Sequence, residues 1–483
     1  MPEHPADALT RPPTSASDDS SAGTRAALGL VVISALASLW LGAGEGITLA
    51  FPVVAVALSW FFLRRGQDVA YLELVLWLWL VTPGLRRIVD YASVWHLNSP
   101  LTLAPSLASL LGLSIALRGR QPVYRDVALA FMSTAIIAIY AFVVGVVHNG
   151  AVAASASLVT WVAPLTFGYA ALMSAVGASS LRRAVTRVAR WSLLLLAAYG
   201  VVQWLLLPPW DAFWVRSVAD FASSFGQPRR FEVRVFSLSN SPGTFAFALT
   251  WLLLVNMVRE RYRLALVATV LGYLAFALTQ VRGAWLGWLV AVMMLSLRGR
   301  VRMLRVVAAA IAVLAILSWF GPAMKVISGR IQETTAARTL DESFQGRLRF
   351  QQQEFPRAFR DIGGRGMGSA GTATRLSSSP SAQTFANVDS GYLETLRVFG
   401  FLPGLTVLWF VTRACVRTWR NTRDADRADS ASASFLLVVP LGMIFGNLLV
   451  GTTGAIVWLL LGVLGRPTQE QLQSAPGGAN AAR

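Results

Sequence analysis

Charged side chains are scarce in this sequence, and cysteine and histidine are scarcer still. Only 14% of the 483 residues are charged, whereas 55% are hydrophobic and the mean hydropathy is +0.56; soluble domains carry about 25% charged residues. The single Cys415 excludes an intramolecular disulfide framework and a cysteine-ligated metal cluster. The three histidines, His4, His96 and His148, are widely spaced, so we expect no metal site and no cofactor.

Lysine is nearly absent as well. Lys325 is the only one, so arginine supplies almost all of the positive charge behind the net charge of +18. A basic chain can indicate a nucleic-acid partner, but these arginines are scattered through loops instead of forming one basic domain. Membrane orientation explains them better, because cytoplasmic loops of membrane proteins are rich in basic residues. The lipid bilayer is therefore the expected partner, and nucleic acid is not.

Apolar runs are abundant. A helix needs about 20 residues to cross a hydrocarbon core of about 30 Å, and this pattern predicts an all-α polytopic membrane protein with about 12–14 transmembrane helices. The candidate spans lie near 27–44, 46–63, 68–83, 100–117, 126–147, 152–177, 191–207, 242–258, 263–280, 283–297, 303–320, 391–412, 433–450 and 452–465.

Charge in the loops predicts the orientation. Residues 1–26 lack the pattern of a signal peptide, and we predict that they and residues 467–483 are disordered cytoplasmic tails flanking a transmembrane domain at 27–466. With alternating spans, every short inner loop then contains arginines. Two outer loops are long, 208–241 and 321–390, and the second is large enough for a small folded element.

The second outer loop contains an amphipathic pattern that predicts a helix at about 340–360. A capping box begins at Thr339, and a glycine pair at Gly363 supplies a stop. Arg347 lies at the edge of the apolar face, with Glu354 beside it, so it either points into a crevice beneath the helix or snorkels at the membrane surface. The apolar face that we expect to rest on the bundle consists of Phe344, Leu348, Phe355 and Phe359.

Two further arginines lie at predicted outer ends of spans. Arg282 begins an apolar helix in "LTQVRGAWLGW", and Arg234 precedes "NSPG", where Ser241 can cap the next helix and Pro242 can occupy its first position. Each has a simpler interpretation, as a boundary residue or as part of a helix cap. Because guanidinium groups bind phosphate oxygens bidentately and remain charged, the two together with Arg347 predict a site for a polyanionic lipid headgroup.

Three charged residues begin the apolar segment "VDSGYLETLRVFGFLPGL": Asp389, Glu394 and Arg397. Burying a charge at mid-membrane costs about 2.5–3.5 kcal/mol on insertion scales, so this placement requires a reason. We expect these residues to form the floor of a site beneath the large outer loop. An arginine cannot act as a base, whereas Asp389, Glu354 or Glu394 can if it is sufficiently shielded.

Four motifs in this order resemble the O-antigen ligase and polymerase family of bacterial membrane proteins. They are "RVFSLSNSPGTFA", "LTQVRGAWLGWLV", "GRLRFQQQEFPRAFRDIGGRGMGS" and "VDSGYLETLRVFGFLPGL", and they cover roughly 230–412. The resemblance implies a multi-pass protein of the bacterial cytoplasmic membrane. It further implies transfer of a glycan from a polyprenyl diphosphate carrier to a hydroxyl acceptor on the outer face, by an inverting, metal-independent displacement.

The resemblance also implies roles for individual residues. Arg282 and Arg347 would hold the diphosphate, and Asp389 would take the proton of the acceptor. Ligases that attach O-antigen to lipid A core have a histidine where this chain has Asp389, which favours polymerisation of surface polysaccharide repeat units over ligation to a lipid or protein acceptor. The residues expected to contact substrate are Arg234, Glu354, Glu394 and Arg397.

A secondary transporter and a structural membrane scaffold are the alternative classes. A transporter predicts internal repeats with charged interruptions in matching halves. Glu73 is the clearest intramembrane charge, and it has no counterpart in the other half of the sequence. A scaffold accounts for the spans but leaves the outer arginines without a role.

Overall fold

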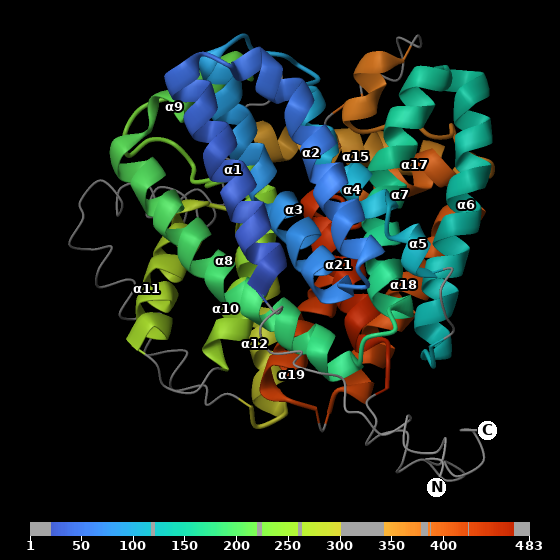
Figure 1. Cartoon of the computed structure of the whole chain (residues 1–483). Helices are drawn as coiled ribbons and strands as arrows, with labels where there is room; N and C mark the ends of the chain where they lie inside the picture. The colour runs from blue at the N-terminus through green and yellow to red at the C-terminus, as the bar shows by residue number, and fades with distance from the viewer. Residues whose placement is uncertain are drawn as a thin grey trace, which may run out of the picture.

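The computed structural model describes residues 21–116, 121–219, 225–258, 263–300, 342–377, 385–386, 388–423 and 425–467, with only the backbone for 116, 263 and 342–348. Over this part the chain is all-α, without a β-strand; one isolated bridge joins Gly226 and Val233. The expectation of an all-α membrane protein agrees with this architecture. Figure 1 shows long helices packed side by side, with α9 (Pro209–Ser217) at one end of the bundle and α19 (Arg427–Leu436) at the other.

Six helices are long and apolar enough to cross a membrane: α1 (Ala22–Leu41), α2 (Gly44–Arg64), α3 (Asp68–Ala92), α6 (Arg125–Asn149), α7 (Ala151–Met173) and α8 (Ala178–Leu206). Shorter apolar helices follow at α10 (Pro242–Met257), α11 (Arg263–Leu278), α12 (Arg282–Leu297) and α21 (Gly451–Leu464). The remaining elements are η3 (Pro100–Leu103), α4 (Ala104–Leu110), α5 (Leu113–Ala116), α15 (Glu342–Arg360), η5 (Thr372–Leu376), α17 (Gly391–Phe399), α18 (Phe401–Asn421) and α20 (Val438–Gly442). The predicted span 303–320 lies outside the described residues.

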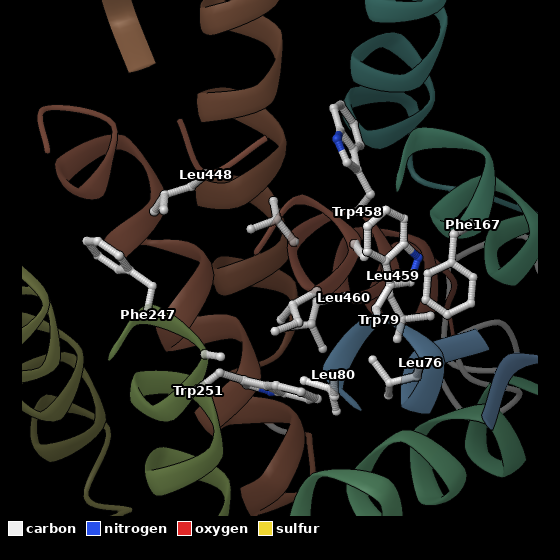
Figure 2. Packing of buried hydrophobic residues seen from close by; sticks show 14 of the residues in the cluster. Leu76, Trp79, Leu80, Phe167, Phe247, Trp251, Leu448, Trp458, Leu459 and Leu460 are labelled. Carbon is white, nitrogen blue, oxygen red and sulfur yellow. The ribbon is translucent and has the colours of Figure 1, made fainter. Parts of the chain in front are cut away.

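Helices α3 and α21 form the centre of the bundle. Of the apolar window of α3, 94% is buried, and α21 is buried from Thr453 to its end. Figure 2 shows side chains from α3, α10 and α21 gathered in this core, among them Leu80, Trp251 and Leu460. Since large side chains from distant parts of the sequence meet here, the core fixes the positions of the ends of these helices.

Peripheral helices expose apolar side chains instead. Only 17% of the apolar window of α1 and 33% of that of α6 are buried. Trp40 is 81% exposed, Ile33 68% and Val147 78%. Isolated exposed apolar residues are normal on a soluble protein, but contiguous apolar helix faces of this size fit contact with lipid.

Charged side chains buried in α3 have partners. Glu73 accepts from Arg187 of α8 at 3.1 Å and from Thr24 of α1 at 3.2 Å, and Asp68 accepts from Ser174 at 2.7 Å. Buried charges inside a bundle are retained where they are paired. Glu73, the clearest intramembrane charge in the sequence, therefore has a structural partner.

Two predicted spans are interrupted. The helix predicted at 391–412 is broken at Gly400, whose φ of 92° is in the left-handed region. Gly400 also has no room for a side chain, because a Cβ there would lie 2.4 Å from the Ile362 carbonyl oxygen. The span predicted at 433–450 ends at Gly442, and residues 443–450 form an irregular turn that leads into α21.

Candidate functional site

The turn at 443–450 is the element around which the candidate site is built. Its far end is fixed on α3, where the Thr452 hydroxyl donates to the Trp79 carbonyl at 3.0 Å. α3 continues from Trp79 to Ala92, which at 1.5 Å per residue is about 20 Å. The start of α21 is therefore recessed below the end of α3. Ile444 and Phe445, at 47% and 43% exposure, form the open surface of the turn.

The first turn of α12 packs against this turn. A Cβ on Gly283 would lie 2.6 Å from the Phe445 ring, and one on Gly287 would lie 2.5 Å from Val438. Both positions must be glycine for α12 to approach so closely. Arg282 is the first residue of α12, next to Gly283, and is exposed, so its charge lies at a helix N-terminus, where anions are favoured.

The start of α17 packs against the same turn. The Gly391 amide donates to the Met443 carbonyl at 2.8 Å, and a Cβ on Gly391 would lie 2.7 Å from the Gly446 carbonyl oxygen. Ser390 caps the helix by accepting from the Leu393 amide. Asp389 precedes this cap and is exposed. The 443–450 turn thus brings the N-termini of α12 and α17, and with them Arg282 and Asp389, to one element.

Arg234 binds the end of α11. Its Nε donates to the Thr279 carbonyl at 3.1 Å and its Nη2 to the Gln280 carbonyl at 3.2 Å. Gln280 has a φ of 56°, a conformation that a non-glycine residue adopts only when the surroundings hold it. Arg234 therefore stabilises the short connection that leads into Arg282, and this position makes it a positioning residue for the site.

A glycine-rich strap, residues 363–371, closes the site on the side of α6 and α7. The Met367 amide donates to the Ala141 carbonyl at 2.8 Å, and Asn149 donates to the Arg365 and Met367 carbonyls at 2.8 and 3.0 Å. A Cβ on Gly366 would lie 2.1 Å from the Gly145 nitrogen. The strap has positive φ values at Gly364, Gly366, Gly368 and Gly371, which only glycine adopts freely.

Arg397 holds the strap against α17. Its Nε donates to the Ser369 carbonyl at 3.0 Å, and its guanidinium lies 3.4 Å from the centre of the Phe385 ring. Burial lowers the pKa of Arg397 to about 10, while the nearby charge of Glu354 opposes the shift. Since the guanidinium is stacked and hydrogen-bonded within the protein, its contacts organise the loop from the inside.

Glu394 lies one turn earlier on α17 and is only 9% exposed. α17 has nine residues and is too short to span a membrane. Burial raises the pKa of Glu394 to about 7, and a hydrogen-bonding contact with the Asn447 side chain works against the rise. Gly371 of the strap faces the carboxylate, because a Cβ there would lie 3.3 Å from Oε1. Glu394 thus lies between the 443–450 turn and the strap.

Helix α15 confirms the predicted helix at about 340–360, but the expected apolar face is wrong in detail. Glu354 and Ala358 are buried, whereas Phe359 is 51% exposed and contacts Phe401 at 5.5 Å between ring centres. Of the two predicted apolar positions whose side chains are described, Phe355 is half-buried and packs against the cluster of Ala358, Leu393 and Leu396, and Phe359 is exposed. The buried face therefore lies one residue further back around the helix. The side chains of Phe344, Arg347 and Leu348 are outside the described part of the chain; Arg347 is two turns before Glu354.

Glu354 has a partner on its own helix. Arg357 donates to it at 2.5 Å, although the Arg357 side chain is 75% exposed.

The structure places five of the seven expected residues around α17 and the 443–450 turn: Arg282, Asp389, Glu394, Arg397 and Glu354. Arg234 binds the connection at Thr279 and Gln280, which precedes Arg282 in the chain.

Sequence reasoning missed the turn itself. Asn447, which touches Glu394, and Phe445, which touches Gly283, lie in a stretch that reads as the end of an apolar span. The signal that could have revealed it is "GMIFGNLLVG", in which three glycines and an asparagine interrupt the run.

Among the described residues, no group of three or more histidine, cysteine, aspartate or glutamate side chains could hold a metal ion. The chemical capacity of the arrangement is that of exposed guanidinium, helix N-termini and one shielded carboxyl group. Neither a comparison with models of protein families nor a search of curated proteins gives a match for this chain.

Proposed function

We propose that the protein is a membrane glycosyltransferase that moves a glycan from a polyprenyl diphosphate carrier to a hydroxyl acceptor. The observation that supports this most directly is the meeting of α12 and α17 on the 443–450 turn. It joins a permanent positive charge at a helix N-terminus, Arg282, to carboxylates at the start of a second helix. A diphosphate leaving group and a hydroxyl nucleophile require those two kinds of group.

In this proposal Arg282 and Arg347 bind the diphosphate. Negative charge develops on the leaving diphosphate as the bond from the anomeric carbon breaks, and preorganised cations lower that barrier. The donor is amphiphilic, so its polyprenyl chain would remain in the lipid while the diphosphate reaches the arginines. The strap at 363–371 and α15 would align the two sugar chains, which makes the displacement effectively intramolecular.

The reaction that we favour is polymerisation of surface polysaccharide repeat units on the outer face of the bacterial cytoplasmic membrane. One feature favours polymerisation over ligation to a lipid or protein acceptor: the last motif begins with Asp389, where those ligases have a histidine.

The test is transfer by the purified protein in liposomes that contain one lipid-diphosphate-linked repeat unit. Chains of two and more units on the carrier are the expected product. Transfer only to an added lipid or protein acceptor would identify a ligase. If neither product forms while the protein is folded and the donor is bound, the glycosyltransferase proposal is wrong.

A further inference from the structure

Three carboxylates border the candidate site, and their surroundings differ. Asp389 is exposed. Glu354 is buried and accepts from Arg357 at 2.5 Å. Glu394 is buried, and no arginine is among the causes that set its pKa. Burial of this kind tunes a carboxylate for proton transfer near neutral pH.

One side of the Glu394 carboxylate faces backbone and no side chain. Its carboxylate is bordered by Asn447 on one side and by Gly371 on another, and a Cβ on Gly371 would lie 3.3 Å from Oε1. Because glycine has no side chain, Oε1 faces only backbone at this point of the strap. In this proposal the acceptor hydroxyl approaches Oε1 along this side, between the strap and the 443–450 turn.

Glu394 is also connected to Arg282 through one short segment. Gly391, one helical turn before Glu394, contacts Gly446 and Asn447, and Gly283, next to Arg282, contacts Phe445. Residues 445–447 thus contact both the first turn of α12, next to Arg282, and the first turn of α17, which leads to Glu394.

The charged and titratable groups around Glu394 come from every neighbouring element. Arg397 lies on the same helix and binds the strap. The others are Asp389 before α17, Glu354 and Arg357 on α15, Asp361, Arg365 and Arg375 in the segment that contains the strap, and His148 at the end of α6. None of these charges is a cause of the raised pKa of Glu394, which burial produces.

We propose that Glu394 is the catalytic base that takes the proton of the acceptor hydroxyl. This inference rests on the proposed glycosyl transfer. The hydroxyl oxygen forms a bond to the anomeric carbon as the bond from that carbon to the diphosphate oxygen breaks. The electron pair leaves with the diphosphate, and the hydroxyl proton moves to the Glu394 carboxylate. Asp389 then has no role in the proton transfer.

The experiment is the pH dependence of the transfer rate in liposomes at saturating donor. The base must be ionised, so the wild-type rate should rise with pH through about 7, the pKa of Glu394. Glu394→Gln keeps the size of the side chain and should lower the rate about 10²–10⁴-fold, the usual contribution of a general base. Glu394→Asp should retain a pH-dependent fraction of the activity. Glu45→Gln, on an exposed glutamate at the start of α2, is the matched control.

Binding of geranylgeranyl diphosphate, measured on each purified variant, separates a chemical defect from a folding defect. The expected result is unchanged binding by Glu394→Gln with transfer lost. The assignment is overturned if Glu394→Gln transfers glycan at a rate near that of wild type, or if Asp389→Asn abolishes the rise with pH; the proposed function survives either result. If wild-type protein binds the diphosphate but never transfers glycan, the proposed function fails together with this assignment.

Discussion

The Arg87 guanidinium lies 3.2 Å from the Asp211 carboxylate, and both side chains are completely buried. This ion pair joins α3 to α9. Arg87 also donates to the carbonyls of Ser237 and Ser239, in the loop that leads to α10, and Tyr199 donates to Asp211 at 2.8 Å. The pair therefore fixes the same loop from which Arg234 reaches the end of α11.

Removing one partner of this pair should destabilise the protein strongly. Asp211→Ala leaves a buried, uncompensated guanidinium, which costs about 3–5 kcal/mol. The double variant Arg87→Met with Asp211→Leu removes both charges and should lose much less. Thermal unfolding of the purified protein in detergent measures the difference. Arg413→Ala breaks a pair with Asp126 in which the arginine side chain is 55% exposed, and should cost at most about 1 kcal/mol. Equal losses for Arg413→Ala and Asp211→Ala would contradict the role of burial.

The close packing of the strap on α6 gives a second prediction. A Cβ on Gly145 would lie 2.3 Å from the Met367 carbonyl oxygen, so Gly145→Ala should push the strap away and destabilise the fold by about 1–3 kcal/mol. It should also increase trypsin cleavage after Arg365. Gly29→Ala is the control, because nothing lies within 4 Å of its Cβ position in α1, and alanine favours a helix over glycine by up to about 1 kcal/mol. A strap unchanged in Gly145→Ala would show that this contact does not hold it.

The positions of most helices could be predicted from the sequence because long apolar runs decide them. The helix predicted at about 340–360 corresponds to α15 (Glu342–Arg360), whereas Thr339 of the capping box lies outside the described residues. What could not be predicted is which face of α15 is buried. Amphipathic periodicity favoured Phe355 and Phe359, but α17 places its own buried Glu394 and half-buried Arg397 toward this region. The buried side of α15 contains Glu354 together with Ala358, which packs with Leu393 and Leu396 of α17.

The 443–450 turn could not be predicted from the sequence for a related reason. An apolar segment forms a helix or an irregular turn according to whether other segments satisfy its backbone groups. Here the Met443 carbonyl accepts from the Gly391 amide and the Leu449 carbonyl accepts from the Trp458 ring nitrogen. These partners come from other parts of the chain, so no local pattern encodes them. Arg282 and Asp389 could be chosen from sequence; their common neighbour could not.

Some arginines that predicted the orientation have a structural role too. Arg298, at the end of α12, donates to the Thr422 carbonyl at 3.3 Å and to the Trp419 carbonyl. Arg300 donates to the carbonyls of Arg423 and Ala425 at 3.0 and 3.1 Å. Cations at a helix C-terminus bind carbonyls that have no partner within the helix. The bias of arginine toward this end of the bundle therefore serves packing as well as insertion.

Orientation is testable because Cys415 is the only cysteine and is buried. In a Cys415→Ala background, Thr372→Cys places an exposed thiol in η5, and Arg423→Cys places one at the end of α18. On intact cells a membrane-impermeant maleimide should label Thr372→Cys and leave Arg423→Cys unlabelled until the membrane is opened. The reverse pattern would invert the topology and place the candidate site in the cytoplasm.

The strictest test of the diphosphate site is the exchange of arginine for lysine. Lysine keeps the charge but loses the planar pair of donors that binds two phosphate oxygens at once. Arg282→Lys and Arg347→Lys should therefore each lower the rate of transfer about 10²–10³-fold, the usual effect of losing one donor to a developing negative charge, with expression and membrane insertion unchanged. Arg360→Lys, on the exposed side of the end of α15, should be nearly silent. Initial rates in liposomes, with protein amounts matched by immunoblot, measure all three. If Arg282→Lys and Arg347→Lys both remain active, the positive charge at these positions is not a bidentate clamp; if Arg360→Lys is as damaging as Arg347→Lys, then the two faces of α15 do not differ in the way that we propose.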